Sequence, residues 1–268
     1  MKAFIPHLVV IFIYLAVALD YWRTSKIEPS SNNLKLHTTM IGLALLIHGY
    51  LLFNSISNGG FNFGVFIALS AIFWLTVLIY WLADFKHELD SLQAFVLPPT
   101  AFFVALEMFN HTEHYIQNPL QPLFVLHIVI ALIAYSLFTF AALHTLLMAL
   151  AERSLHQKSS PILLPAFPPL LTMETLLFRI TKIGFVLLTF TLISGIFFSE
   201  QLFGKPLQLN HKTVFSIASW LIYAGLLWGR HTYGWRGRKA IIWSQTGFML
   251  LLLAYIGSKF VLEVLLHR

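Results

Sequence analysis

Four histidines interrupt or begin apolar runs of this chain, and they are its strongest candidates for chemistry. His48 lies within LLIHGYLLF and His127 within PLFVLHIVI, while His7 and His211 stand near the start of two other apolar runs. Neutral imidazole is a common metal ligand and the usual axial ligand of haem iron. An ionisable side chain inside a membrane span is costly unless a partner holds it, so each position is a candidate functional site.

Two imidazoles that face each other across a helix bundle would form a bis-histidine haem site. The 25 Phe residues of the chain supply apolar side chains that could cover a porphyrin. We therefore expect His48 and His127 to be haem-iron ligands. An interfacial role remains open for His7 and a helix cap for His127, because spacing alone does not show that two helices are neighbours.

Other types of chemistry have weaker support in the sequence. Glu107 and His111 are four residues apart and could handle protons, although interfacial hydrogen bonding is the better explanation of the pair. There is no phosphate-binding loop, no Ser-His-Asp arrangement and no pair of carboxylates, so nothing indicates a hydrolase or an ATPase. The chain has no cysteine, which excludes disulfides and thiolate metal sites. We expect no bond-forming catalysis.

The composition is that of an integral membrane protein. Hydrophobic residues make up 58% of the 268 residues and charged residues 10%, with a mean hydropathy of +0.77. Soluble domains carry about 25% charged residues. The net charge of +6 comes from Lys and Arg residues, which in a membrane protein mainly determine its orientation in the bilayer. We therefore expect no nucleic-acid partner.

Eight apolar segments are long enough to cross a bilayer, which requires about 20 residues. The sequence thus predicts an all-α integral membrane protein, a bundle of eight transmembrane helices forming a single domain over residues 1–268. The predicted helices cover residues 4–22, 36–53, 63–83, 92–109, 123–150, 175–199, 213–229 and 240–266.

The distribution of Lys and Arg predicts the orientation of this bundle. Four of them lie on the side of the two termini, and ten lie in the first, third, fifth and seventh loops. Because basic loops stay in the cytoplasm, we expect both termini outside and His7, His48, His127 and His211 near the outer surface. The ten are Arg23, Lys26, Lys35, Lys86, Arg153, Lys158, Arg230, Arg236, Arg238 and Lys239.

Two stretches resemble a known family. PLFVLHIVIALIAYSLFTFAALHTLLMALAERSL, from Pro122, and WGRHTYGWRGRKAIIWSQTGFMLLLLAYIGSKFVLE, from Trp228, are similar to the cytochrome c assembly proteins of the CcsA/HemX-like group. The resemblance is closest to the YpjD-type inner-membrane proteins of that group. It covers mainly the half of the chain from His127 onward and is looser over the first four predicted helices.

The resemblance implies a multi-pass protein of the bacterial inner membrane that binds haem b near the outer face. It implies a role in cytochrome c or haem-protein biogenesis, alongside other cytochrome assembly proteins. Within it, His48 matches the histidine of the second helix and His127 matches an outer histidine. Two alternatives stay open: a haem-free membrane scaffold or regulator of the HemX type, and a proton-coupled transporter of a small solute using His48 and Glu107.

The chain departs from this family in the segment before the seventh predicted helix. Full haem-attaching members carry a tryptophan-rich outer segment there, whereas EQLFGKPLQLNHKTVFSIASW is short and has no Trp before Trp220. His211 stands about where the family has an Asp. We expect His211 to be a third haem-binding residue, with Lys212 beside it pairing a propionate, or else to cap its helix.

Overall fold

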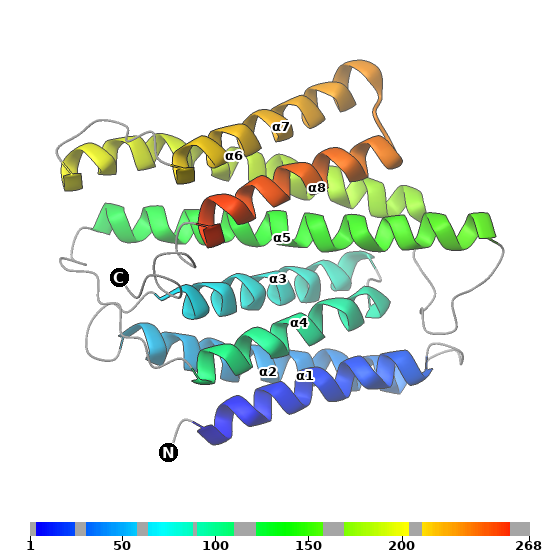
Figure 1. The fold of residues 1–268 in the computed structure, drawn as a ribbon. Helices are drawn as coiled ribbons and strands as arrows, with labels where there is room; N and C mark the ends of the chain where they lie inside the picture. The colour runs from blue at the N-terminus through cyan, green and yellow to red at the C-terminus, as the bar shows by residue number, and fades with distance from the viewer. Residues whose placement is uncertain are drawn as a thin grey trace. The chain divides into compact units, whose positions relative to one another are not determined.

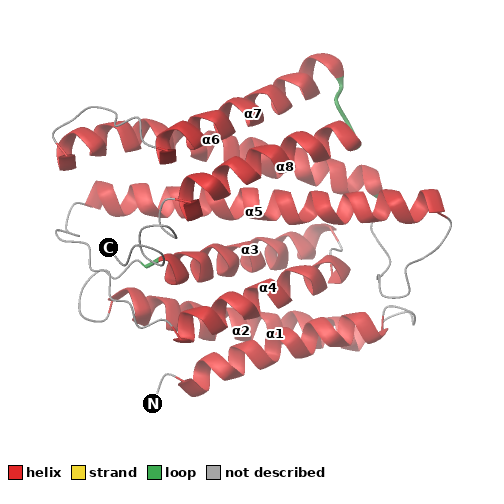
Figure 2. Ribbon diagram, in the orientation of Figure 1, coloured by secondary structure: helices red, strands yellow, loops and turns green. Residues whose placement is uncertain are grey.

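The computed structural model describes residues 4–24, 31–57, 64–87, 90–109, 122–157, 169–203 and 211–257. These residues are almost entirely helical, and they contain no strand (Figures 1 and 2). The helices are α1 (Phe4–Thr24), α2 (Ser31–Ser57), α3 (Val65–His87), α4 (Asp90–Phe109), α5 (Pro122–Gln157), α6 (Leu170–Phe203), α7 (His211–Tyr233) and α8 (Arg238–Leu252), and α8 continues into a π-helical turn, η1 (Leu253–Gly257).

Six of the helices, α1 to α6, are long and apolar enough to cross a membrane, so the protein is a multi-pass membrane protein. The prediction of eight crossings is thus confirmed in part. α8 has only 15 residues, and the remainder of the segment predicted over 240–266 lies outside the described residues beyond 257. Crossing by α7 and α8, and the outer location of the two termini, remain predictions.

The chain divides into two compact units. Unit 1 contains α1 to α4 together with the last residues of α5 and the first residues of α6. Unit 2 contains most of α5 and α6 together with α7, α8 and η1. The single domain over residues 1–268 therefore stays a prediction, and each unit is described by itself.

Unit 1 is a ring of four helices. α1 packs against α2 and α4, and α3 packs against the same two helices (Figure 1). Between α2 and α3 the ring is closed by Trp74 and Trp81, whose indole N–H groups donate to the carbonyl oxygens of Leu45 and Thr38 at 2.8 and 2.9 Å. The hydrocarbon core of a membrane contains no water to bond with these polar groups, so a hydrogen bond to the neighbouring helix satisfies them instead.

The same two tryptophans require glycine on α2. Gly42 lies under Trp81 and Gly49 under Trp74, and a Cβ added at Gly49 would stand 3.0 Å from the indole. Both pairs are seven residues apart on their helices, which keeps them on one face. Small residues facing large rings thus fix the rotation of α2 and place the neighbouring His48 in the centre of the ring.

In unit 2, α7 and α8 form a hairpin whose facing surfaces are small and polar. Gly234 and Gly237, in the turn, have φ of 63° and 51°, which favours glycine. The Ser219 hydroxyl on α7 donates to the carbonyl oxygen of Gly247 at 2.7 Å, and the Tyr223 hydroxyl donates to that of Ser244 at 3.2 Å. The hydroxyls of Ser219 and Tyr223 are therefore satisfied by the neighbouring helix α8.

Candidate functional site

His48 lies at the centre of unit 1 and is fully enclosed, with 0% of its surface exposed. Its Nε2 forms a hydrogen bond with the Ser70 hydroxyl of α3 at 2.9 Å. Its Nδ1 faces the Tyr14 hydroxyl of α1 at 3.4 Å, a long hydrogen bond, and Tyr14 is also 0% exposed. Both ring nitrogens have protein partners, so a metal ion could reach either one only by displacing a hydrogen bond.

A second group of polar side chains continues from His48 toward one end of unit 1. The Ser55 hydroxyl of α2 donates to Glu107 Oε1 of α4 at 2.9 Å. His7 of α1 is buried and close enough to act electrostatically on both His48 and Glu107. These side chains, from all four helices of the ring, are called the His48 cluster and comprise His7, Tyr14, His48, Ser55, Ser70 and Glu107.

His127 has a different setting in unit 2. Its Nδ1 lies 2.7 Å from the Ser194 hydroxyl of α6, and that hydroxyl donates to the carbonyl oxygen of Phe190 at 2.7 Å. With its proton in that bond, the Ser194 hydroxyl can accept from His127, and the imidazole would then carry its proton on Nδ1. The Nε2 lone pair then becomes the coordinating position, the arrangement found in most metal-bound histidines.

The surroundings of His127 are aromatic and cationic. The Phe124 ring stacks toward the imidazole with centroids 6.4 Å apart, and the Phe198 ring meets it edge-on at 5.5 Å. Lys212, at the start of α7, is close enough to act on the charge of His127. His211 precedes it as the first residue of α7 and is exposed. The structure therefore brings His127 and the start of α7 to the same end of unit 2.

The predicted pairing of His48 with His127 is not tested by this arrangement. The two histidines belong to different units, and each unit is described by itself. His111, predicted as a partner of Glu107, lies outside the described residues. Within the described part of the chain, no group of three or more His, Asp or Glu side chains could hold a metal ion by itself. A site here would need a metal that arrives with ligands of its own.

Haem is such a group, and the residues around His127 fit it. The imidazole is half-buried and has one nitrogen fixed and the other able to ligate. Aromatic side chains lie on two sides of it, and a lysine lies nearby for a carboxylate. The His48 setting fits less well, because both nitrogens are bonded and the ring is sealed.

The sequence interpretation missed the two serines that define these settings. Ser70 and Ser194 each lie within a strongly apolar stretch of helix, Ser70 in FIALSAIFW and Ser194 in FTLISGIFF. Isolated hydroxyls in a span commonly bond within or between helices, and this was an available signal. The partner of each serine depends on helix rotation, which hydropathy does not report.

Comparison with known proteins agrees with this architecture. The model of the family described as cytochrome C assembly protein matches residues 34–266. "Inner membrane protein YpjD" of Escherichia coli (strain K12) is 36% identical over 162 residues, covering 60% of this chain and 60% of that protein. "Cytochrome c biogenesis protein CcsA" of Prochlorococcus marinus (strain MIT 9301) is 40% identical over 88 residues, covering 33% of this chain and 28% of that protein.

The range matched by the family model includes both His48 and His127. The matched part of the chain spans less than two thirds of the length of either relative, so a relative's whole activity does not transfer with the match. The family model extends from α2 to residue 266, over three of the four ring helices of unit 1 and nearly all of unit 2. With most of its length matched, this chain belongs to the cytochrome c assembly protein family.

Proposed function

We propose that this protein binds haem through His127 and takes part in cytochrome c biogenesis. His127 Nε2 would be the iron ligand, Phe124 and Phe198 would pack against the porphyrin, and Lys212 would pair a propionate. His211 would add a second polar donor at the same end of unit 2. Bound haem would supply redox-active iron and be the group passed on to other proteins.

One observation carries this proposal: the hydrogen bond between His127 Nδ1 and Ser194. A second partner of this kind fixes the tautomer, orients the ring and raises the basicity of the ligating nitrogen. A histidine that only capped α5 or faced lipid headgroups would not need a hydroxyl from α6. The bond therefore favours a ligand role for His127 over an interfacial one.

The biological setting of the proposal follows from the relatives. One is named as a cytochrome c biogenesis protein and another as an inner membrane protein, so we propose a bacterial inner membrane location. Haem b is the form expected, because a chain without cysteine cannot hold haem through thioethers. Its partners would be other cytochrome assembly proteins, and His48 would be the second iron ligand only if its bond to Ser70 opens.

The first experiment is optical. Full-length protein would be purified in detergent from haem-replete cells, and its reduced-minus-oxidised spectrum recorded for the wild type and for His127→Ala and His48→Ala. We expect a b-type spectrum that is lost in His127→Ala. Loss in His48→Ala as well would support the bis-histidine pair predicted from the sequence.

The matched control is His231→Ala, which removes an exposed histidine at the opposite end of α7. Its spectrum should equal that of the wild type. A spectrum without haem bands after loading the wild type with haemin would overturn the proposal. The haem-free scaffold or regulator would then be the better explanation, and the next step would be to isolate its protein partners.

A second candidate function, proton transfer across unit 1, has an observation of its own. The His48 cluster lies at one end of the ring, and at the other end His37 Nε2 lies 2.8 Å from Asp20 Oδ2. Buried ionisable groups at both ends of a membrane bundle are the usual parts of a proton relay. In liposomes with an entrapped pH dye, Glu107→Gln should abolish proton flux, whereas Glu152→Gln on α5 should not.

A further inference from the structure

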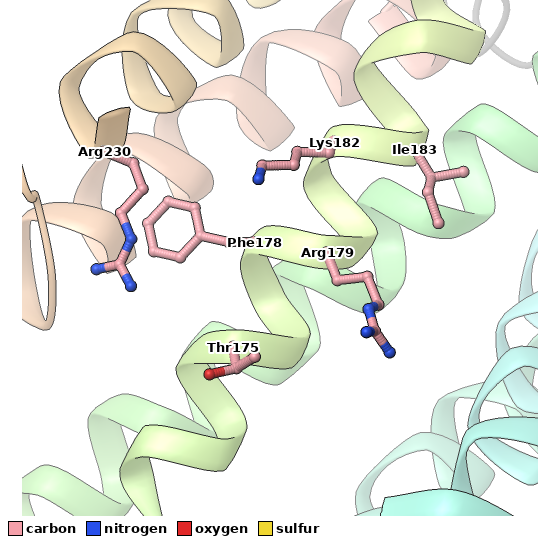
Figure 3. A pocket seen from close by; sticks show the side chains of 6 residues that line it. All are labelled: Thr175, Phe178, Arg179, Lys182, Ile183 and Arg230. Atoms are coloured by element: carbon pink, nitrogen blue, oxygen red, sulfur yellow. The ribbon is translucent and has the colours of Figure 1, made fainter. Parts of the chain in front are cut away.

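A pocket of about 430 Å³ opens between α6 and α7 of unit 2, far along α6 from Ser194. It is lined by Thr175, Phe178, Arg179, Lys182, Ile183 and Arg230 (Figure 3). Three of these six side chains are cationic. Lys182 points toward the ring of Phe178 and the guanidinium of Arg230, while Arg179 extends on the other side of α6 (Figure 3).

The cations of this pocket differ in how they are held. Arg230 Nη1 donates to Glu174 Oε1 at 2.6 Å and to the carbonyl oxygen of Trp235 at 3.0 Å, and its guanidinium lies 4.5 Å from the centroid of Phe178. It is a fixed donor with little freedom. Arg236 Nε donates to the same Glu174 oxygen at 2.9 Å, so one carboxylate serves two guanidinium groups and positive charge remains in excess.

Arg179 and Lys182 add further positive charge, which no acidic side chain of the described residues neutralises. Both are exposed, and among the described residues neither has a hydrogen bond or an ion pair. A membrane helix usually places such residues where an anion or water is available, because an uncompensated cation in hydrocarbon is costly. Arg179 and Lys182 therefore lack an anionic partner from the described part of the chain.

The surface of α6 beyond these cations is apolar and exposed. Starting one turn after Lys182, large hydrophobic side chains recur every three or four residues on one helix face, with 43–64% of their surface exposed. They are Val186, Phe190, Ile193 and Phe197, with Ile183 and Ile196 beside them. A cationic pocket thus stands at the head of a continuous apolar stripe more than three turns long.

We propose that this pocket is a binding site for an anionic phospholipid. The phosphate is held by Lys182 and the fixed Arg230, Arg179 adds positive charge on the neighbouring side of α6, and one acyl chain lies along the apolar stripe of α6. Basic pockets between membrane helices bind anionic headgroups, and Arg suits phosphate because its donors form a planar fork. A free anion would use the cations alone, whereas a lipid uses the cations and the stripe together.

The headgroup pocket of this site is distinct from the proposed haem site. The pocket lies at the first turns of α6 and the last turn of α7, whereas His127, Ser194 and Lys212 lie at the opposite ends of the helices of unit 2. Failure of haem binding would therefore leave this proposal intact, and the reverse also holds.

The test measures lipid retention by the full-length protein in a non-ionic detergent. Dioleoyl phosphatidylglycerol or dioleoyl phosphatidylcholine is added, and bound lipid is counted by native mass spectrometry. We expect retention of phosphatidylglycerol by the wild type and little retention of phosphatidylcholine. Arg179→Gln with Lys182→Gln should weaken phosphatidylglycerol binding about tenfold or more, since each nearby cation contributes severalfold to affinity.

The matched control is Lys35→Gln with Arg153→Gln, which removes two exposed cations outside the pocket. This variant should retain phosphatidylglycerol as the wild type does. A third arm, Phe190→Ser, disrupts the apolar stripe and should weaken phosphatidylglycerol binding without changing any charge. Thermal unfolding checks that all variants are folded, as expected for exposed positions.

Three outcomes would overturn the proposal. Equal weakening in the control pair would show a general charge effect. Equal retention of phosphatidylglycerol and phosphatidylcholine would show no headgroup recognition. Complete competition by glycerol 3-phosphate, with Phe190→Ser unchanged, would show a site for a soluble phosphate or for the acidic segment of a protein.

Discussion

His48 and His127 are the same residue type in membrane helices of similar apolarity, yet the two units treat them differently. In unit 1 the imidazole is sealed and both nitrogens are bonded, to Ser70 and toward Tyr14. In unit 2 it is half-buried, with Nδ1 bonded to Ser194 and with no hydrogen-bond partner for Nε2 among the described residues. The comparison teaches that the number of engaged nitrogens separates a histidine that builds a core from one that can bind a ligand.

The largest expected effect tests whether His127 is the haem ligand. His127→Gly should remove the haem spectrum entirely, and added imidazole should restore it, because free imidazole can occupy the space left by the side chain. His48→Gly should not be rescued, since its site is closed. The measurement is the absorbance of haemin-loaded protein with and without imidazole. Rescue of His48→Gly alone would reverse the two assignments.

The next largest effect tests whether His48 is a structural residue of the core. His48→Ala should lower the free energy of unfolding by about 3 kcal/mol, because it leaves a cavity and removes the hydrogen bonds of His48 with Ser70 and Tyr14 in the core. His127→Ala should cost about 1 kcal/mol or less, as expected for a half-buried position without haem. Unfolding of the haem-free variants in detergent, followed by circular dichroism, checks the order. Equal losses of stability in the two variants would contradict the structural role assigned to His48 alone.

A smaller effect concerns the bond that orients His127. Ser194→Ala should keep the haem spectrum but weaken haem affinity about 10–100-fold, the usual result of losing an outer partner of a metal ligand. Competition with apomyoglobin measures the affinity. Ser194→Thr, which keeps the hydroxyl, serves as the control and should stay near the wild-type value. Unchanged affinity in Ser194→Ala would mean that the His127–Ser194 bond is only structural.

The smallest effect is expected from removing the serine hydroxyl that bonds to His48 in unit 1. Ser70→Ala should cost about 0.6 kcal/mol of stability, which is typical of one hydrogen bond between membrane helices. Haem affinity should stay unchanged, because this bond does not orient a ligand. If Ser70→Ala instead strengthened haem binding, releasing His48 Nε2 would have created a ligand, and the bis-histidine prediction would gain direct support.

The sequence predicted the helices well because hydrophobic runs are local. α1 and α4 agree with the predicted segments to within two residues at each end. α5 extends to Gln157 although the predicted span ended at residue 150, because hydropathy marks the apolar region and helical hydrogen bonding continues into AERSLHQ. The end predicted for the last span lies outside the described residues.

The partners of the candidate residues could not be predicted in the same way. Ser70 is 22 residues from His48 and Ser194 is 67 residues from His127. Which side chain meets which depends on the rotation of each helix, and in unit 1 that rotation is set by Trp74 and Trp81 packing over glycines. The sequence indicated which histidines matter, and only the three-dimensional packing separates their roles.

The pairing of α7 with α8 has a consequence for how the protein is made. Ser219 and Tyr223 of α7 find their acceptors on α8, at Gly247 and Ser244. Until α8 has left the ribosome, those hydroxyls have no such acceptors, so α7 alone is a poor substrate for release into lipid. The two helices are therefore expected to leave the translocation channel as one hairpin, and a chain stopped at Tyr233 should be recognised and degraded by membrane quality-control proteases.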